Sequence, residues 1–176
     1  MREQDTAAIV ACIPRLRRYA RGLAGDAAAA DDLVQDTLER AWSRLPLWER
    51  RGDLRAWMFG ILHNRFVDGV RAARRRPEDS AGDALPELPQ RASQDDGLEV
   101  RDLDGALRRL PPEQREVLLL VAVEEMRYAE AAAVLGVPVG TVMSRLARGR
   151  ERLRQELQGR APGAPQAAAA PLRRIK

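Results

Sequence analysis

Apolar residues recur at intervals of three and four along most of this chain, and this spacing places them on one face of an α-helix. In the first 76 residues, the first block, the pattern predicts three helices at about 6–23, 28–44 and 54–75. We expect Pro14 to kink or restart the first helix, and acidic residues to fill the first turn of the second. The residues expected to face inward are Ile9, Ile13, Leu16 and Leu23, then Leu33, Leu38, Ala41 and Trp42, and then Trp57, Met58, Ile61, Leu62 and Phe66.

A second helical block is predicted from about residue 101 to residue 158. Leu103, Leu107 and Leu110 mark a short helix, and Pro111 and Pro112 end it and begin the next one. The apolar run 117–123 fits either a buried strand or a buried helix, and its charged flanks and proline entry favour the helix. Helix-forming residues dominate, and no stretch alternates at period two, so the sequence predicts an all-α fold.

The segments outside these blocks have a different composition. Residues 77–100 are rich in proline and acid and predict a flexible acidic linker, while residues 159–176 are rich in Gly, Pro and Ala and predict a disordered tail. The chain has a net charge of +4, but residues 77–104 hold nine acids and two arginines, which leaves +11 for the remainder. Basic blocks on both sides of an acidic connector suggest a polyanion as partner.

Within the second block, the spacing of small residues is typical of a helix-turn-helix. Ala131 and Ala132 allow the close approach of a second helix, Gly136 suits a turn that needs positive φ, and Val142 lies where the second helix needs a core anchor. At about 100° per residue, Val142 shares its face with Leu146, Gly149, Leu153 and Leu157. A different face carries only small polar residues and arginine, namely Thr141, Ser144, Arg145, Arg148 and Arg152.

That single-sign face is suited to contacts with phosphates and guanines in a major groove. The alternative is an ordinary solvated helix in an arginine-rich protein. Arginine abundance alone does not decide between the two, because 29 of the 30 basic residues of this chain are arginine. The sorting of the arginines onto one face favours a DNA-reading helix.

Few residues in this chain are suited to catalysis or metal binding. Cys12 is the only cysteine and His63 the only histidine, and no carboxylates cluster at metal-ligand spacing. We therefore expect no catalytic residue, no metal and no cofactor, which disfavours an enzyme such as a nuclease; His63 is expected on a helix surface. The sequence suggests neither a signal peptide nor a membrane span, so we expect a cytoplasmic protein with no membrane insertion.

Two segments together resemble one protein family. Residues 110–157, LPPEQREVLLLVAVEEMRYAEAAAVLGVPVGTVMSRLARGRERLRQEL, resemble region 4 of bacterial extracytoplasmic-function sigma factors. Residues 31–42, DDLVQDTLERAW, followed by residues 55–76, RAWMFGILHNRFVDGVRAARRR, resemble region 2 of the same family. The resemblance implies two small helical domains, a three-helix region 2 at 1–76 and a helix-turn-helix region 4 at 101–158, joined by the linker.

The resemblance also implies functional roles. Region 4 would read the minus-thirty-five promoter element through the polar face described above. Region 2 would recognise and melt the minus-ten element and dock on core RNA polymerase. By position, the minus-ten residues would be Trp48, which would capture a flipped base, together with Asn64, Arg65, Arg71, Arg74 and Arg75. The polymerase-docking residues would be Asp31, Asp32, Gln35, Asp36, Glu39 and Arg40.

These assignments have simpler alternatives. The acidic set fits a merely solvated helix face, and Trp57 and Phe66 are expected in the core. A stand-alone helix-turn-helix repressor or activator would explain the second block, predicting a dimer and a palindromic site, but would leave residues 31–76 unexplained. The resemblance implies instead a protein that is monomeric when free, with core polymerase, promoter DNA and an anti-sigma factor as partners.

The chain departs from the family pattern at three positions. Pro138 and Arg127 replace the usual hydroxyl caps of the two helices of the motif, and a lost cap typically costs about 0.5–2 kcal/mol. Met143 replaces a frequent lysine, which removes one expected phosphate contact. These departures bear on promoter affinity and specificity.

Overall fold

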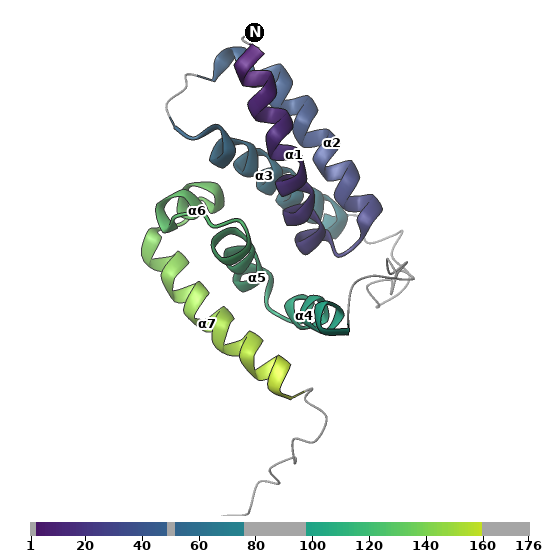
Figure 1. Ribbon diagram of the computed structural model, residues 1–176, viewed down its shortest axis with the longest axis vertical. Helices are drawn as coiled ribbons and strands as arrows, with labels where there is room; N and C mark the ends of the chain where they lie inside the picture. Colours follow the sequence, from purple (N-terminus) through teal and green to yellow (C-terminus); the bar gives the residue numbers. More distant parts are fainter. Residues whose placement is uncertain (1–2, 49–51, 76–97, 160–176) are drawn as a thin grey trace, which may run out of the picture.

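The computed structural model describes residues 3–48, 52–75 and 98–159, and these contain helices and no strand. The first block is a three-helix bundle of α1 (Glu3–Ala24), α2 (Ala27–Arg44) and α3 (Leu54–Arg75), with a short 3₁₀ turn, η1 (Leu45–Leu47), after α2. Figure 1 shows the three helices packed together in the upper part of the molecule. The all-α prediction is confirmed, and the third helix has the predicted bounds.

Two local features of these helices differ from what the sequence suggested. Pro14 does not restart the first helix, because it lies inside α1, which continues on both sides of it; Pro14 and Val10, whose carbonyl lacks the usual donor, are both exposed. The first turn of α2 holds no acid; instead the side chain of Asp26 caps the helix and accepts a hydrogen bond from the Ala29 N–H at 2.8 Å.

The core of the first block is centred on Tyr19 and Phe59, whose ring centroids are 5.3 Å apart. The buried residues of α2 lie on one line at helical spacing and are Ala30, Val34, Thr37 and Ala41. Trp42 follows this line by one residue, which rotates it about 100° away, so it is 43% exposed rather than inward-facing. His63 was expected on a helix surface but is only 7% exposed, because α3 packs against both other helices of the bundle.

The second block comprises α4 (Leu98–Arg108), α5 (Pro112–Leu118), η3 (Leu119–Val123), α6 (Tyr128–Leu135) and α7 (Val139–Gln158). Helix α4 begins three residues before the predicted boundary, and its buried residue is Ala106, whereas Leu103 is 41% exposed. Pro112 occupies the first turn of α5, as expected.

The apolar run 117–123 is helical, as predicted, but its last turn is widened. The Glu124 N–H bonds the Leu119 carbonyl five residues back at 2.9 Å, which makes η3 a π-helical turn. Glu125 then takes a left-handed φ of 55° and ends the helix. Such turns are often found at functional positions, and this one places Glu124 with its side chain fully buried.

The two blocks pack directly against each other. Helix α6 lies beside α3, and α5 lies against α1 (Figure 1). The buried residues of both blocks form one continuous hydrophobic cluster. The predicted linker, apart from the first turn of α4, and the predicted tail, apart from Gly159, lie outside the described residues.

Candidate nucleic-acid and polymerase interface

Helices α6 and α7 form the predicted helix-turn-helix. Ala131 and Ala132 are buried where the two helices meet, Gly136 has a φ of +65°, and Val142 is fully buried. The turn is closed by a hydrogen bond from the Val137 N–H to the Ala132 carbonyl at 3.1 Å. The small-residue and glycine spacing therefore produces the geometry that the sequence predicted.

The two helix starts use different capping devices. At the start of α6, the Glu130 carboxylate reaches back to the Arg127 N–H at 2.9 Å, so glutamate supplies the carboxylate half of a capping box without a hydroxyl cap. At the start of α7, Pro138 makes no side-chain cap. Its backbone carbonyl accepts instead from the Thr141 N–H at 2.9 Å and the Val142 N–H at 3.2 Å.

The inner face of α7 fixes the orientation of its outer face. Val142, Leu146 and Gly149 are buried. Gly149 lies so close to α5 that a Cβ at this position would be 3.0 Å from Leu118 Cδ1. This close approach sets the rotation of α7 about its axis and so turns Ser144, the midpoint of the predicted reading face, to solvent.

Of the predicted reading residues, Ser144, Arg148 and Arg152 are exposed, while Thr141 and Arg145 are half-buried. Arg148 donates to the Ser144 carbonyl from Nε at 3.2 Å and to Ser144 Oγ from Nη2 at 3.4 Å, which holds its guanidinium along the outer face. Arg145 lies near Glu116 of α5: burial raises the pKa of Glu116, and the positive charges of Arg115 and Arg145 oppose that rise. Arg145 is therefore turned partly toward its own domain.

The sequence did not predict an apolar contact to DNA for two residues on this helix. Val139 is 42% exposed and Met143 is 52% exposed, both in the first two turns of α7, where a recognition helix approaches base edges. A helical wheel centred on Val142 already places Met143 about 100° from the core line, so the signal was present in the sequence. Apolar groups in this position are suited to contact thymine methyl groups.

The predicted polymerase-docking residues form one exposed face of α2, comprising Asp31, Asp32, Gln35, Asp36, Glu39 and Arg40. The face is partly engaged in ion pairs of its own: Asp31 pairs with Arg17 of α1 at 3.2 Å, and Asp36 pairs with Arg65 of α3. The second pair joins a predicted docking residue to a predicted minus-ten residue. The two predicted surfaces are therefore adjacent on the bundle.

The predicted minus-ten residues lie along α3 and the turn before it. Trp48 stacks on Trp57, with ring centroids 5.8 Å apart and planes 26° apart. Asn64 is exposed in the middle of α3, and Arg71 and Arg75 are exposed near its end. The side chain of Arg74 and residues 49–51 of the preceding loop lie outside the described residues.

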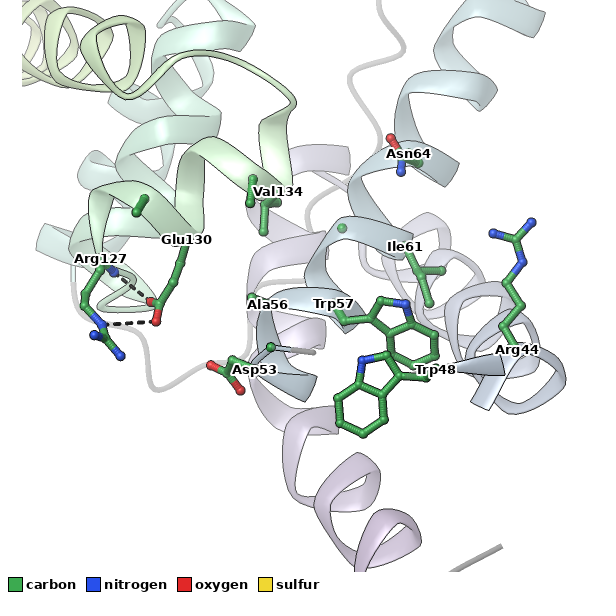
Figure 2. Close-up of a pocket in the computed structure, with 14 residues that line it drawn as sticks. Arg44, Trp48, Asp53, Ala56, Trp57, Ile61, Asn64, Arg127, Glu130 and Val134 are labelled. Carbon is green, nitrogen blue, oxygen red and sulfur yellow. Dashed lines mark hydrogen bonds and ion pairs between the residues drawn. The ribbon is translucent and has the colours of Figure 1, made fainter. Parts of the chain in front are cut away.

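The stacked tryptophans form part of a cavity of about 1060 Å³. One wall belongs to the first block and includes Trp48, Trp57, Ile61 and Asn64, and the facing wall is α6. Figure 2 shows the two tryptophans on one side and Arg127, Glu130 and Val134 on the other. The predicted minus-ten surface thus faces the second block.

The described residues contain no group of three or more His, Cys, Asp or Glu side chains that could hold a metal ion. Burial lowers the pKa of His63, whose Nδ1 has no hydrogen-bond partner among the described residues. Within 3–48, 52–75 and 98–159, no single helix has the length and apolar composition to cross a membrane; α6 and α7 meet that test only as a pair, with a bend of 100° between them.

Comparison with known proteins identifies both blocks. The family model described as the Sigma2 domain of PhyR matches residues 9–63, and the model described as Sigma-70, region 4 matches residues 101–153. The chain is 41% identical over 145 residues to the ECF RNA polymerase sigma factor EcfG of Rhodopseudomonas palustris, covering 82% of this chain and 80% of that protein.

Solved structures give the same result. The fold is similar to that of the sigma factor RpoE from Bartonella quintana, solved in complex with the anti-sigma factor NepR, with a TM-score of 0.81, 34% identity, and coverage of 89% of this chain and 98% of that chain. It is also similar to CnrH, solved in complex with the cytosolic domain of CnrY, with a TM-score of 0.68, 29% identity, and coverage of 89% of both chains. With both modules present in the same order and this identity over four-fifths of each chain, the protein belongs to the extracytoplasmic-function (ECF) RNA polymerase sigma factors.

Proposed function

We propose that this protein binds core RNA polymerase and directs it to specific promoters, with a different task for each of its two helical blocks. The observation that carries the proposal is the presence in one chain of two modules, a helix-turn-helix with a basic outer face and a three-helix bundle with an exposed acidic face. A stand-alone repressor or activator needs only the first of these. We call the first block region 2 and the second block region 4 from here on.

In region 4, α7 enters the major groove of the minus-thirty-five element. Ser144, Arg148 and Arg152 supply exposed polar and basic groups, with Arg148 held in place by Ser144. Thr141 and Arg145 lie at the edge of the same face and contribute from a half-buried position. A guanidinium suits the O6 and N7 acceptors of guanine, and each bidentate contact of this kind is worth about 1–3 kcal/mol of discrimination.

In region 2, α3 and the turn before it bind the minus-ten element. Opening a duplex requires unstacking, and an exposed base is stabilised by stacking on an aromatic ring. Trp48 is half-buried and already supported from behind by Trp57, so it offers a rigid platform for one base. Asn64 and Arg65 lie on α3, and Arg71 and Arg75, further along the same helix, follow the phosphates.

The acidic face of α2, with its six residues from Asp31 to Arg40, docks on the polymerase. All six are exposed, which a docking surface requires, and their net charge is negative, opposite to that of the DNA-binding face. The protein acts by binding alone, as a cytoplasmic transcription factor without a catalytic residue, metal or cofactor. By similarity to RpoE, which was solved with an anti-sigma factor, an anti-sigma protein is proposed as a further partner.

Run-off transcription tests the proposal. Purified protein is added to sigma-free core polymerase over a library of promoters, and the expected result is a transcript from a defined subset of them. An absence of any promoter-specific transcript, although protein and polymerase bind each other, would contradict the proposal. Two variants of exposed acids test the docking face of α2. Asp32→Arg should weaken polymerase binding through like-charge or steric conflict. Asp68→Arg changes an exposed acid on α3 outside the docking face, and this control protein should dock normally.

A further inference from the structure

The outer surface of α7 has two flanks of different chemistry. At about 100° per residue, Arg148 and Arg152 lie about 80–120° from the buried Val142 in one direction around the helix, whereas Val139 and Met143 lie about 60–100° from it in the other. All four of these side chains are exposed. The helix is therefore basic on one flank and apolar on the other.

The apolar flank is distinguished by its position rather than by its exposure alone. Single exposed apolar residues are common on soluble proteins, but Val139 and Met143 are four residues apart, so they are neighbours on successive turns. Their exposed fractions are 42% and 52%. They belong to the first two turns of the second helix of the helix-turn-helix, the part that contacts base edges. The apolar flank thus continues the surface that we assign to DNA.

A helix in the major groove presents both of its flanks to the DNA. An α-helix with its side chains is about 10–12 Å across, and the groove is about 12 Å wide. The positive charges of Arg148 and Arg152 suit phosphates and the acceptors of guanine on one side. The apolar group that base pairs present in this groove is the C5 methyl of thymine. An unbranched, polarisable methionine side chain is suited to cover it.

The chemistry of residue 143 favours base reading over uniform attraction. A lysine at this position would be drawn to phosphates and would strengthen binding to every sequence. Met143 carries no charge, so it adds nothing to that attraction. A half-exposed methionine gains from DNA by covering an apolar group, and only base pairs that contain thymine offer one in the major groove.

We propose that Met143, supported by Val139, selects one thymine of the minus-thirty-five element by covering its C5 methyl group. The inference rests on the proposed function, in which α7 enters the major groove. Met143 and Arg148 are five residues apart, which is about 7.5 Å along the helix, and successive base pairs are about 3.4 Å apart. The thymine therefore lies at a different base pair from the one that Arg148 contacts.

Three substitutions at residue 143 separate the methyl contact from charge and from folding. Met143→Ala removes the apolar contact, Met143→Leu keeps it, and Met143→Lys replaces it with a charge. Alanine, leucine and lysine favour helix about as much as methionine or more, so α7 should stay intact. The matched control is Leu157→Ala, which truncates another exposed apolar residue of α7 about 21 Å further along the helix.

The assay measures the affinity of the reconstituted holoenzyme for promoter duplexes with altered thymines. Each thymine of the upstream element is replaced in turn by deoxyuridine, which lacks only the C5 methyl group. The promoter is one obtained from the run-off assay. If no transcript is obtained, the duplex is one that the full chain enriches from a random pool, and binding is then measured with the full chain alone.

We expect the wild type to bind roughly fourfold more weakly when one particular thymine loses its methyl group, which is the factor that burial of one such carbon contributes. Met143→Leu and Leu157→Ala should keep this sensitivity at the same thymine. Met143→Ala should bind the thymine duplex more weakly and should not distinguish it from the deoxyuridine duplex. Met143→Lys should also lose the distinction, while the slope of log K against log salt becomes steeper by about 0.9.

The methyl contact is refuted if no thymine is sensitive to the loss of its methyl group, if Met143→Ala remains as sensitive as the wild type, or if Leu157→Ala abolishes the sensitivity as well. These outcomes are separate from the fate of the proposed function. A promoter-specific transcript without a methyl effect would overturn only the contact of Met143. A missing transcript would overturn the proposed function, while the enriched duplex still decides whether Met143 reads a methyl group. A failure to enrich any duplex would overturn both.

Discussion

Replacing Arg148 with alanine tests the reading face of α7 most directly. Arg148 is exposed, and its guanidinium is held against Ser144 by hydrogen bonds of 3.2 and 3.4 Å. Because both bonds are to the preceding turn of the same helix, the side chain is partly ordered before DNA arrives. Alanine is also the better helix former, so the substitution should leave the stability of α7 nearly unchanged.

The expected loss depends on what Arg148 contacts. A bidentate contact to guanine is worth about 1–3 kcal/mol, which corresponds to roughly 5- to 150-fold in affinity, and its loss should abolish the preference at one base pair. A contact to phosphate alone would instead weaken all sequences equally and reduce the slope of log K against log salt by about 0.9. The exposed position and the preorganised guanidinium favour the first outcome.

The assay measures the affinity of the reconstituted holoenzyme for promoter duplexes in which each base pair of the upstream element is changed in turn. The matched control is Arg150→Ala, which removes the same charge from the same helix at a position about 200° around it. Arg148→Ala should lose both affinity and preference at one position, while Arg150→Ala should lose little and keep the preference. Equal, uniform losses for the two variants would refute the assignment of the reading face.

Three further predictions concern stability. Leu146→Ala should lower the free energy of unfolding by about 2–5 kcal/mol, because Leu146 is 3% exposed under the helix-turn-helix, whereas Leu157→Ala, at an exposed position on the same helix, should cost far less; equal losses in denaturant titrations would contradict this packing. Tyr19→Phe should leave stability unchanged or raise it by about 1 kcal/mol, because the Tyr19 hydroxyl is buried without a hydrogen-bond partner in the described part of the chain, and a clear loss in thermal unfolding would reveal a partner. Burial raises the pKa of Glu116 above its usual 4.5, so the folded state binds this proton more tightly, and stability falls as the pH rises through the raised pKa. Glu116→Gln should therefore stabilise the protein at pH 7 and lose that advantage below about pH 4. A gain in stability that is independent of pH would exclude this cause.

The sequence was sufficient where structure depends on near neighbours along the chain. The spacing of Ala131, Gly136 and Val142 determined the helix-turn-helix, since helix packing and a positive φ impose steric demands that only small residues meet. The bounds of α3 and the sorting of polar residues on α7 followed from helical periodicity in the same way. These features need no knowledge of what lies across the core.

The tertiary structure decided the features that depend on distant partners. Glu124 stands in a polar stretch that periodicity assigns to solvent, yet it is fully buried because Arg18, 106 residues away, lies opposite it. His63 is buried because α3 packs against both other helices of the bundle, and Arg145 lies close to Glu116 of a neighbouring helix. The periodicity of one helix states which residues share a face, but the element that covers that face is determined only when the whole chain packs.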